Sequence, residues 1–336
     1  HGQEVGDEVL RVAAQYLHGL LDVNNGELLA RVSGRRFALI WRDTALAPVD
    51  NRINQLLRRL QVPWSVGSLS VHLQPRLGAD RHTLLAQTPP SGVWQHVEFA
   101  LAQARRQNEG QRCVWFEPEM DVEAQQRQSL LQDLYAAVNE KQFLVLYQPF
   151  VDLRNGQVVG AEALVRWQHP SRGLLSPVLF IPLAEEHGVI VALGGWVLEQ
   201  VCQQLAQWRA QGFTDLTVAV NVSVLQLQQN GFATFVLQLL EQYALPSRCL
   251  ELEVTESLAL TPSAVVEANL AQLAVAQVRL AIDDFGTGYA SFSFLRRFSV
   301  QKLKIDKSFV DHVLDSPQGA TLVRTIIGMG TSLAVT

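Results

Sequence analysis

The sequence predicts two α/β domains, the second of them built on a parallel β-sheet. The chain has 336 residues, which is enough for two domains of about 100–200 residues each. Hydrophobic residues make up 48% and charged residues 18%, a mixture typical of globular domains rather than of disordered segments. From residue 143 onward, strand-like runs alternate with helical runs. Such alternation indicates a parallel sheet that is either closed into a barrel or doubly wound.

In the first 117 residues, helical and strand-like patterns are mixed. We predict helices and strands, in chain order, at Val5–Leu21, Leu28–Trp41 (two strands), Val49–Leu60, Val66–Leu73 (a strand), Val93–Gln107 and Cys113–Phe116 (a strand). Asn24-Asn25-Gly26 is a turn signal between the first two. The polar stretch 118–128 is predicted to link the domains, so we expect domains at 1–117 and 129–336.

The second domain begins with a predicted helix at Ser129–Lys141. Six strand-like runs follow, at Phe143–Val151, Val158–Trp167, Leu216–Val222, Leu250–Val254, Val278–Asp283 and Lys302–Ile305. Helical runs fill the longer gaps, at Gly195–Gln211, Phe232–Tyr243 and Ala264–Gln277.

Charge and composition argue against several kinds of partner. The formal net charge is -5, and no run of Lys and Arg is long enough for a DNA or RNA duplex surface. No apolar run reaches the ~18 residues of a membrane span, so we expect no membrane contact within this chain. Cys113, Cys202 and Cys249 match no zinc spacing and indicate reduced thiols in a cytoplasmic protein. A membrane-anchored or sensory region of a parent protein would lie outside this chain.

Polar residues recur within or at the end of the predicted strands of the second domain. They are Glu162, Asn221, Glu253, Asp283, Asp284, Lys304 and Asp306. Burying such groups is costly unless they are paired or bind metal, and in a (β/α) barrel the strand ends converge on one mouth. Carboxylate and amide oxygens suit Mg²⁺, Mn²⁺ or Ca²⁺ rather than zinc, and adjacent aspartates could share two metal ions. The alternative is a set of core ion pairs and capping residues, with Lys304 as the natural partner of the acids.

Several motifs in this region resemble one protein family. They are YQP at Tyr147–Pro149, EALVRW at Glu162–Trp167, NVS at Asn221–Ser223, EVTES at Glu253–Ser257, DDFGTGYASFSFL at Asp283–Leu295 and KLKIDKSFV at Lys302–Val310. In type and order these motifs resemble those of EAL domains, which hydrolyse the bacterial messenger cyclic di-GMP with divalent metal ions. The resemblance implies a TIM-like (β/α) barrel and a phosphodiesterase that forms linear pGpG.

The resemblance also implies roles for individual residues. The expected ligands of two Mg²⁺ or Mn²⁺ ions are Glu162, Asn221, Glu253, Asp283 and Asp284. Lys304, Glu256 and Asp306 match catalytic-site positions, with Glu256 steadying the loop that follows Asp284. Gln148, Leu164 and Arg166 match contacts to the substrate, and the guanidinium of Arg166 suits a phosphate.

The first domain resembles a GGDEF domain, the ferredoxin-like cyclase family that makes cyclic di-GMP from GTP. HGQEVGDEVL resembles the family's GH-x-x-GD helix, and RVSGRRF aligns with RxGGDEF. Arg35 and Arg36 replace the acidic pair that would hold metal, so the resemblance implies a degenerate domain without diguanylate cyclase activity. The inhibitory RxxD pattern is also lost, since Asn24 and Glu27 stand at its ends. This leaves a structural or dimerisation module, or a sensor that binds GTP.

Both ends of the chain look cut. It starts at His1 without a Met, and it stops at Thr336, just where a catalytic glutamate of the family would follow. We therefore expect parts of both domains to be missing. The alternative to a phosphodiesterase is a catalytically inactive cyclic di-GMP receptor that signals through domain rearrangement, and a third reading is a scaffold without ligand. Homodimerisation is expected by analogy alone.

Overall fold

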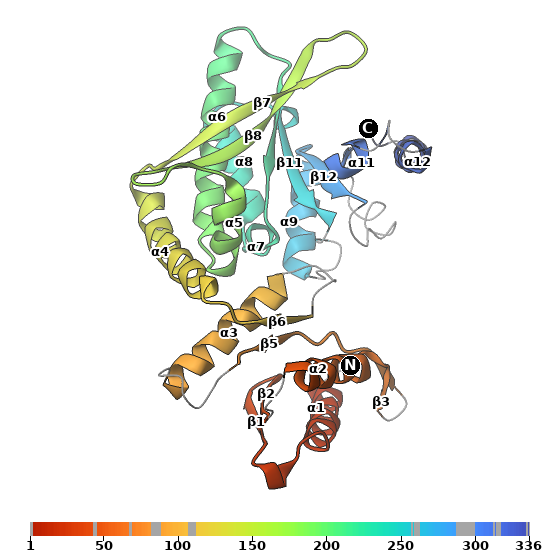
Figure 1. Cartoon of the computed structure of the whole chain (residues 1–336). Helices are drawn as coiled ribbons and strands as arrows, with labels where there is room; N and C mark the ends of the chain where they lie inside the picture. The colour runs from red at the N-terminus through yellow and green to blue at the C-terminus, as the bar shows by residue number, and fades with distance from the viewer. Residues whose placement is uncertain are drawn as a thin grey trace. The chain divides into compact units, whose positions relative to one another are not determined.

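The structure is a computed structural model, and it describes residues 3–42, 46–66, 69–81, 89–106, 112–256, 258, 263–286, 300–311, 313, 317–333 and 335. The chain divides into two compact units, His1–Arg127 and Gln128–Thr336. Figure 1 follows both units from red at the N-terminus to blue at the C-terminus. Among the described residues, no helix combines the length and the hydrophobicity of a membrane span.

The described residues of the first unit include three long helices and three small two-stranded sheets. In chain order its elements are α1 (Gln3–His18), the 3-10 helix η1 (Val23–Asn25), β1 (Leu28–Ser33), β2 (Arg36–Ile40), α2 (Leu46–Gln61), β3 (Trp64–Val66), β4 (Leu69–Val71), β5 (Leu77–Ala79), α3 (Pro90–Arg106) and β6 (Cys113–Trp115). Strands β1 and β2 pair antiparallel, as do β3 and β4, whereas β5 and β6 pair parallel. Leu17, Leu56 and Leu60 form one buried cluster beneath the first sheet.

Two expectations for this unit need correction. Val66–Leu73 is not one strand, because β3 and β4 form a hairpin there. Strand β5 was not predicted at all. Apolar residues alternate in both strands of the pair, so the alternation alone does not show that two strands, rather than one, are present.

Helix α4 (Glu119–Asn139) begins ten residues before the predicted Ser129, so most of the segment 118–128 is helical rather than an extended linker. Glu119 and Asp121 lie in its first turn, where carboxylates favour the partial positive charge of the helix N-terminus. Met120 packs in a cluster of the first unit, and Leu130 and Leu134 pack in the core of the second. The helix therefore contributes to both units.

The second unit is a seven-stranded sheet with helices. In chain order its elements are β7 (Phe143–Val151), β8 (Val158–His169), β9 (Gly173–Leu175), α5 (Pro177–Glu186), α6 (Ile190–Ala210), β10 (Thr217–Asn221), α7 (Val224–Leu227), α8 (Phe232–Gln242), the 3-10 helix η2 (Ser247–Cys249), β11 (Leu250–Thr255), α9 (Ala264–Val275), β12 (Arg279–Phe285), β13 (Lys302–Ile305), α11 (Lys307–Asp311) and α12 (Pro317–Ser332). All six predicted strands and all three predicted helices of this region are present.

The sheet has the order β7-β8-β10-β11-β12-β13, with β9 paired to β8. Strands β8 to β13 along this path are parallel, as predicted. Strand β7 departs from that prediction, because it runs antiparallel to β8. Only residues 152–157 join the two strands, and a parallel connection needs a dozen or more residues. Asp152 closes this turn by accepting a hydrogen bond from the backbone N–H of Arg154 at 2.9 Å.

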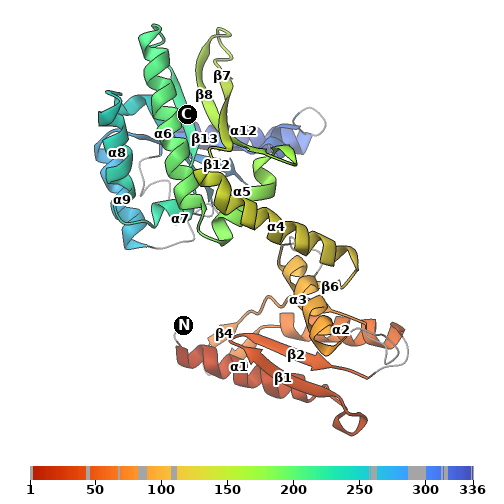
Figure 2. The same cartoon turned by 90° about the vertical axis from the view of Figure 1, so that its left-hand side faces the viewer.

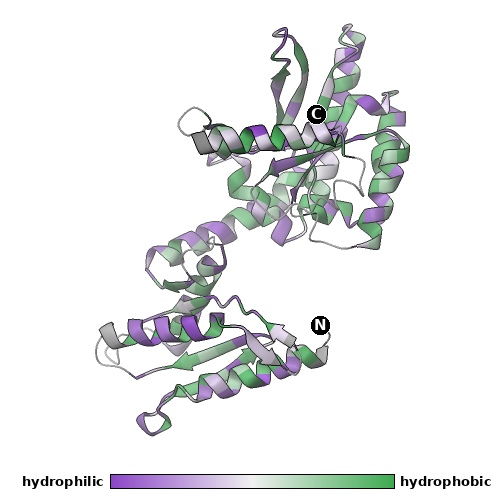
Figure 3. Cartoon of the chain, turned by 90° about the vertical axis from the view of Figure 1, so that its right-hand side faces the viewer, coloured by the Kyte–Doolittle hydropathy of each residue, from purple (hydrophilic) through white to green (hydrophobic). Residues whose placement is uncertain are grey.

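The core of the second unit lies between the sheet and its helices. Helix α8 packs against both α6 and α9, and the three helices lie together on one side of the sheet (Figures 1 and 2). Trp167, Phe180 and Leu198 are fully buried there. The helices carry hydrophilic as well as hydrophobic residues (Figure 3). The opposite face of the sheet carries small and charged side chains instead, and it positions the site described next.

Candidate active site

The register of the parallel strands brings the predicted polar residues together. Glu162 lies on β8 opposite Ala219, and Asn221 at the end of β10 pairs with Glu253 on β11. Asp283 on β12 pairs with Thr255. Because side chains two residues apart point to the same face of a strand, this register places the carboxylates on one face towards the carboxyl ends of the strands.

Lys304 on β13 lies at the centre of this group. Its Nζ donates hydrogen bonds to Glu253 Oε2 at 2.6 Å, to Glu162 Oε2 at 3.1 Å and to Asp283 Oδ2 at 3.1 Å. Burial disfavours the charged form of this ammonium, but the three carboxylates outweigh burial and raise the pKa of Lys304 above its usual value. The lysine is therefore the counter-ion that keeps three acids close together.

Glu253 is the most buried member of the group, with 1% of its surface exposed. Burial raises the pKa of Glu253 to about 7, and Lys304 opposes this rise only in part. Its Oε1 is buried and has no hydrogen-bond partner among the described residues. An unpaired buried carboxylate oxygen is costly, so this atom is suited to bind a cation.

Asn221 completes this side of the site through an amide contact. Its Nδ2 donates to Glu162 Oε1 at 2.8 Å. The turn that follows is fixed by a capping box, in which the side chains of Ser223 and Gln226 each bond the other residue's backbone N–H. Gln226 packs so closely against α6 that a Cβ at Gly194 would lie 2.1 Å from Gln226 Nε2. These contacts fix the backbone that follows Asn221, and with it the direction of the Asn221 side chain.

Asp284 and Asp306 form a second acidic pair beside the first group. Asp284 has a left-handed backbone (φ 54°), a conformation that aspartate tolerates better than most residues. Burial, then the charges of Asp283 and Asp306, raise the pKa of Asp284. Asp306 accepts hydrogen bonds from the backbone N–H and the hydroxyl of Ser308, and these lower its pKa. The pKa values of the two neighbouring aspartates are thus shifted in opposite directions, upward for Asp284 and downward for Asp306.

Glu256 lies next to Gly286, the residue that follows β12. Its Oε2 accepts a hydrogen bond from the backbone N–H of Gly286 at 3.1 Å. Gly286 has φ 101°, and a Cβ there would lie 2.9 Å from Phe309 Cε2, so only glycine fits. Ser257 and residues 287–299, which include most of the DFGTGYASFSFL motif and Gly288, lie outside the described residues.

The three expected substrate contacts lie next to this group. Gln148 on β7 pairs directly with Glu162. Leu164 and Arg166 follow Glu162 at two-residue intervals on β8 and so share its face. Arg166 Nη1 donates a hydrogen bond to the Val165 carbonyl at 2.9 Å. Remaining donors of its guanidinium are suited to an anion on this face.

These residues fit a divalent metal ion. Ligand oxygens of Glu162, Glu253 and Asp283 lie within 4.8 Å of one another. Three carboxylates, a neighbouring amide and the unsatisfied Oε1 of Glu253 form a hard oxygen donor set of the kind that Mg²⁺ and Mn²⁺ prefer. The alternative prediction, a set of core ion pairs, also holds in part, because Lys304 forms salt bridges with all three acids.

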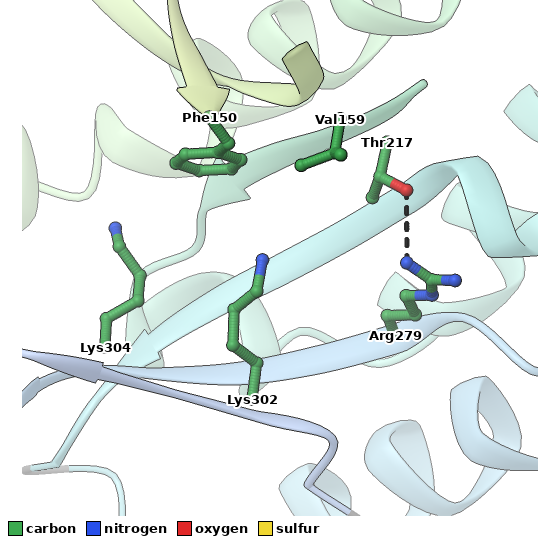
Figure 4. Close-up of a pocket in the computed structure, with 6 residues that line it drawn as sticks. All are labelled: Phe150, Val159, Thr217, Arg279, Lys302 and Lys304. Carbon is green, nitrogen blue, oxygen red and sulfur yellow. Dashed lines mark hydrogen bonds between the residues drawn. The ribbon is translucent and has the colours of Figure 1, made fainter. Parts of the chain in front are cut away.

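A second charged pair, which was not predicted, lies on the same face. Lys302 Nζ donates to Glu251 Oε1 at 2.6 Å and lies 4.7 Å from the centre of the Phe150 ring. Both lysines line a cavity of about 380 Å³, shown in Figure 4, whose other walls are Phe150, Val159, Thr217 and Arg279. The signal was present in the sequence, since Glu251 and Lys302 each precede a predicted site residue by two positions.

In the first unit, the expected degenerate motif lies on the β1–β2 hairpin. Gly34 and Arg35 form its turn, and Arg36 begins β2. Arg36 Nη1 lies 3.1 Å from Glu98 Oε2 on α3, in a salt bridge. Two arginines thus stand at this hairpin, and Arg36 is paired with Glu98.

Comparison with known families agrees with the motifs. The pattern of the EAL domain matches residues 131–336, more than half of the chain. The chain belongs to the EAL-domain family. The pattern described as "Diguanylate cyclase, GGDEF domain" matches residues 1–111, so this member carries a GGDEF region followed by an EAL domain. Its strands β7 to β13 are accordingly part of the TIM-like barrel of EAL domains.

Several relatives share this arrangement. The chain is 33% identical over 99% of its length to the bifunctional diguanylate cyclase/cyclic di-GMP phosphodiesterase MucR of Pseudomonas aeruginosa, and covers 48% of that protein. It is also 33% identical over 99% of its length to the cyclic di-GMP phosphodiesterase PdeR of Escherichia coli, and covers 50% of that protein. The chain therefore spans about half the length of these relatives.

Solved structures of EAL proteins resemble the second unit. The PaMucR phosphodiesterase in complex with c-di-GMP is 40% identical, with a TM-score of 0.59 over 62% of this chain and 84% of that one. The EAL enzyme Bd1971, in its form bound to cAMP and cyclic di-GMP, is 30% identical, with a TM-score of 0.60 over 63% of this chain and 58% of that one.

Proposed function

We propose that the EAL domain of this protein hydrolyses one phosphodiester bond of cyclic di-GMP to give linear pGpG, using Mg²⁺ or Mn²⁺. The observation that carries the proposal is the cluster of Glu162, Glu253 and Asp283 around Lys304, with the oxygen Glu253 Oε1 left unsatisfied. The substrate is supported by the relatives MucR and PdeR, whose names give cyclic di-GMP phosphodiesterase activity.

The metal ligands in this proposal are Glu162, Asn221, Glu253, Asp283 and Asp284. Divalent ions held there supply an activated water and neutralise charge on the phosphate. Asp283 and Asp284 are adjacent on β12, and the left-handed backbone at Asp284 interrupts the strand's alternation of sides, so the two carboxylates suit two neighbouring ions. Asp306, ionised because of Ser308, extends the acidic rim beside Asp284.

Lys304 and the β8 residues act on the substrate itself. The Lys304 ammonium lies between three carboxylates and can donate to the attacking water or to the phosphoryl oxygens as negative charge develops. Arg166 binds a phosphate with its planar fork of donors, and Gln148 and Leu164 contact the nucleotide. Glu256 holds the backbone at Gly286, so it positions the loop and does not touch the reacting atoms.

For the GGDEF region we propose a regulatory role without diguanylate cyclase activity. Arg35 and Arg36 carry positive charge where the family has acids, and Arg36 is paired with Glu98. Two cations repel Mg²⁺ and cannot hold it as a carboxylate pair would. Binding of GTP to this region and homodimerisation of the protein are further predictions, each tested by direct binding and by mass measurement in solution.

The decisive experiment incubates the protein with cyclic di-GMP and follows pGpG by chromatography, with Mg²⁺, with Mn²⁺ and with EDTA. We expect product only with metal, and none from Glu162→Ala. Product formed in EDTA would contradict the mechanism. Binding of cyclic di-GMP without product in the presence of metal would favour the catalytically inactive receptor.

A further inference from the structure

Two glutamate–lysine pairs span the same two strands, one behind the other. Glu253 pairs with Lys304 at 2.6 Å, and Glu251 pairs with Lys302 at 2.6 Å. In each strand the two residues are separated by two positions, so both pairs lie on one face of the sheet. Figure 4 shows Lys302 and Lys304 projecting to the same side from their strand. In TIM barrels, layers at this depth are usually filled by branched apolar side chains.

Both pairs reach across an intervening strand. Strand β12 lies between β11 and β13, so the paired residues come from backbones roughly 9–10 Å apart. At this level β12 presents Ala281, which is fully buried and offers only a methyl group. The long side chains of lysine and glutamate can therefore meet above it.

The register shows that two glutamates, Glu251 and Glu253, are candidate partners of Lys302. Lys302 is aligned with Ala281, and Ala281 is aligned with Glu253. The lysine is thus level with Glu253, yet its ammonium bonds Glu251, two positions earlier on the same strand. Glu251 has 2% of its side chain exposed, and its ion pair with Lys302 compensates the cost of burying this carboxylate. The Phe150 ring at 4.7 Å holds the ammonium on the same side.

We propose that Glu251 is a positioning residue that captures the Lys302 ammonium and so keeps it away from Glu253. Without Glu251, Lys302 turns towards the nearest remaining carboxylate, which is Glu253, and occupies the oxygen Oε1 that is now unsatisfied. A divalent cation then has to displace an ammonium ion before it can bind. This inference rests on the proposed function, because it concerns the metal site of the same reaction.

The test measures metal binding directly and needs no turnover. The intact protein is titrated with Mn²⁺, and free Mn²⁺ is followed by electron paramagnetic resonance. We expect Glu251→Gln to weaken Mn²⁺ binding by about tenfold, the lower end of the loss seen when a residue that orients metal ligands is changed. Adding Lys302→Met to Glu251→Gln removes the competing ammonium and restores the affinity to within about twofold of the wild type.

Rescue by the second substitution separates this role from a structural one. If Glu251 only stabilised the fold, the double variant would bind Mn²⁺ as weakly as Glu251→Gln, and the inference would be wrong. Unchanged affinity in Glu251→Gln would also overturn it. Lys302→Met alone is the independent check, since it should bind Mn²⁺ at least as tightly as the wild type, and a tenfold loss there would contradict us. Failure of the wild type to bind Mn²⁺ would instead remove the proposed metal site itself.

Discussion

Removing the Lys304 ammonium is the most informative perturbation of the carboxylate cluster. Lys304→Met keeps the length of the side chain and removes the charge that bonds Glu162, Glu253 and Asp283 at 3.1, 2.6 and 3.1 Å. The three acids then face one another without a counter-ion. We expect the metal-free variant to be less stable than the wild type and to lose hydrolysis of cyclic di-GMP.

The structure sets the size of this loss. Breaking a buried ion pair by removing one partner costs about 3–5 kcal/mol. Lys304 is 21% exposed and Glu253 has a pKa of about 7, so solvent and proton uptake by Glu253 each reduce the cost. We therefore expect the free energy of unfolding to fall by about 2–4 kcal/mol in EDTA. An ion present at about 100 times its Kd adds about 2.7 kcal/mol, so saturating Mg²⁺ should restore most of the loss.

The assay is urea unfolding at neutral pH, in EDTA and in Mg²⁺. The matched control is Lys307→Met, because Lys307 is 85% exposed and lies 4.0 Å from its partner Asp311, so its loss should change stability by less than about 0.5 kcal/mol. If Lys304→Met in EDTA is as stable as the control, the reasoning about the buried cluster is refuted. Equal stabilisation of variant and wild type by Mg²⁺ would show that ion and ammonium do not compete for the same acids.

Three further predictions follow from other groups. Because burial raises the pKa of Glu253 to about 7 and its proton must leave before metal binds, Mn²⁺ affinity should fall by about tenfold between roughly pH 8 and pH 6, and an affinity independent of pH would contradict this. The buried side chain of Asn269 forms hydrogen bonds with the backbone of three other residues, at 2.8, 2.9 and 3.1 Å. Asn269→Ala should therefore lower the free energy of unfolding in urea by about 2–3 kcal/mol. The control is Gln272→Ala at an exposed position of the same helix, which should lower it by less than about 0.5 kcal/mol. The hydrogen bond from Arg52 lowers the pKa of Glu27 from 4.5 to about 2, so ionised Glu27 stabilises the fold above pH 4.5 and this stabilisation is lost as the pH falls towards 2. Glu27→Gln should therefore reduce the dependence of the melting temperature on pH between pH 4.5 and pH 2. An unchanged dependence in the variant would argue against this role of Glu27.

Much of the EAL-domain sheet could be predicted because its strands are buried on both faces or alternate clearly. Phe143–Val151 and Lys302–Ile305 have the predicted bounds at both ends. The antiparallel direction of β7 could have been inferred from the six residues that separate it from β8, but apolar patterning alone gives no strand direction. In the GGDEF region the strands have only three residues at β3 to β6, and so short a run gives little periodic signal.

Residue types in the site were predictable, but their pairings were not. Strand ends that converge on one mouth imply that Glu162, Glu253 and Asp283 meet, and they do meet. Sequence spacing could not show that Lys304 bonds all three at once, because this depends on the curvature and register of the sheet. The pair of Glu251 and Lys302 was missed for the same reason, since it crosses a strand. The roles of these residues in catalysis stay predictions.

The wide separation of the cluster along the chain has a consequence for how the protein folds. The β7–β8 hairpin is local and can form within microseconds, whereas Lys304 lies 142 residues beyond Glu162. Contacts of such large separation pay a loop-closure cost and are expected to form late. During synthesis the acids on β8, β11 and β12 emerge before the lysine that neutralises them. Until β13 is added, this part of the sheet is expected to depend on protonation or on cations from the surroundings.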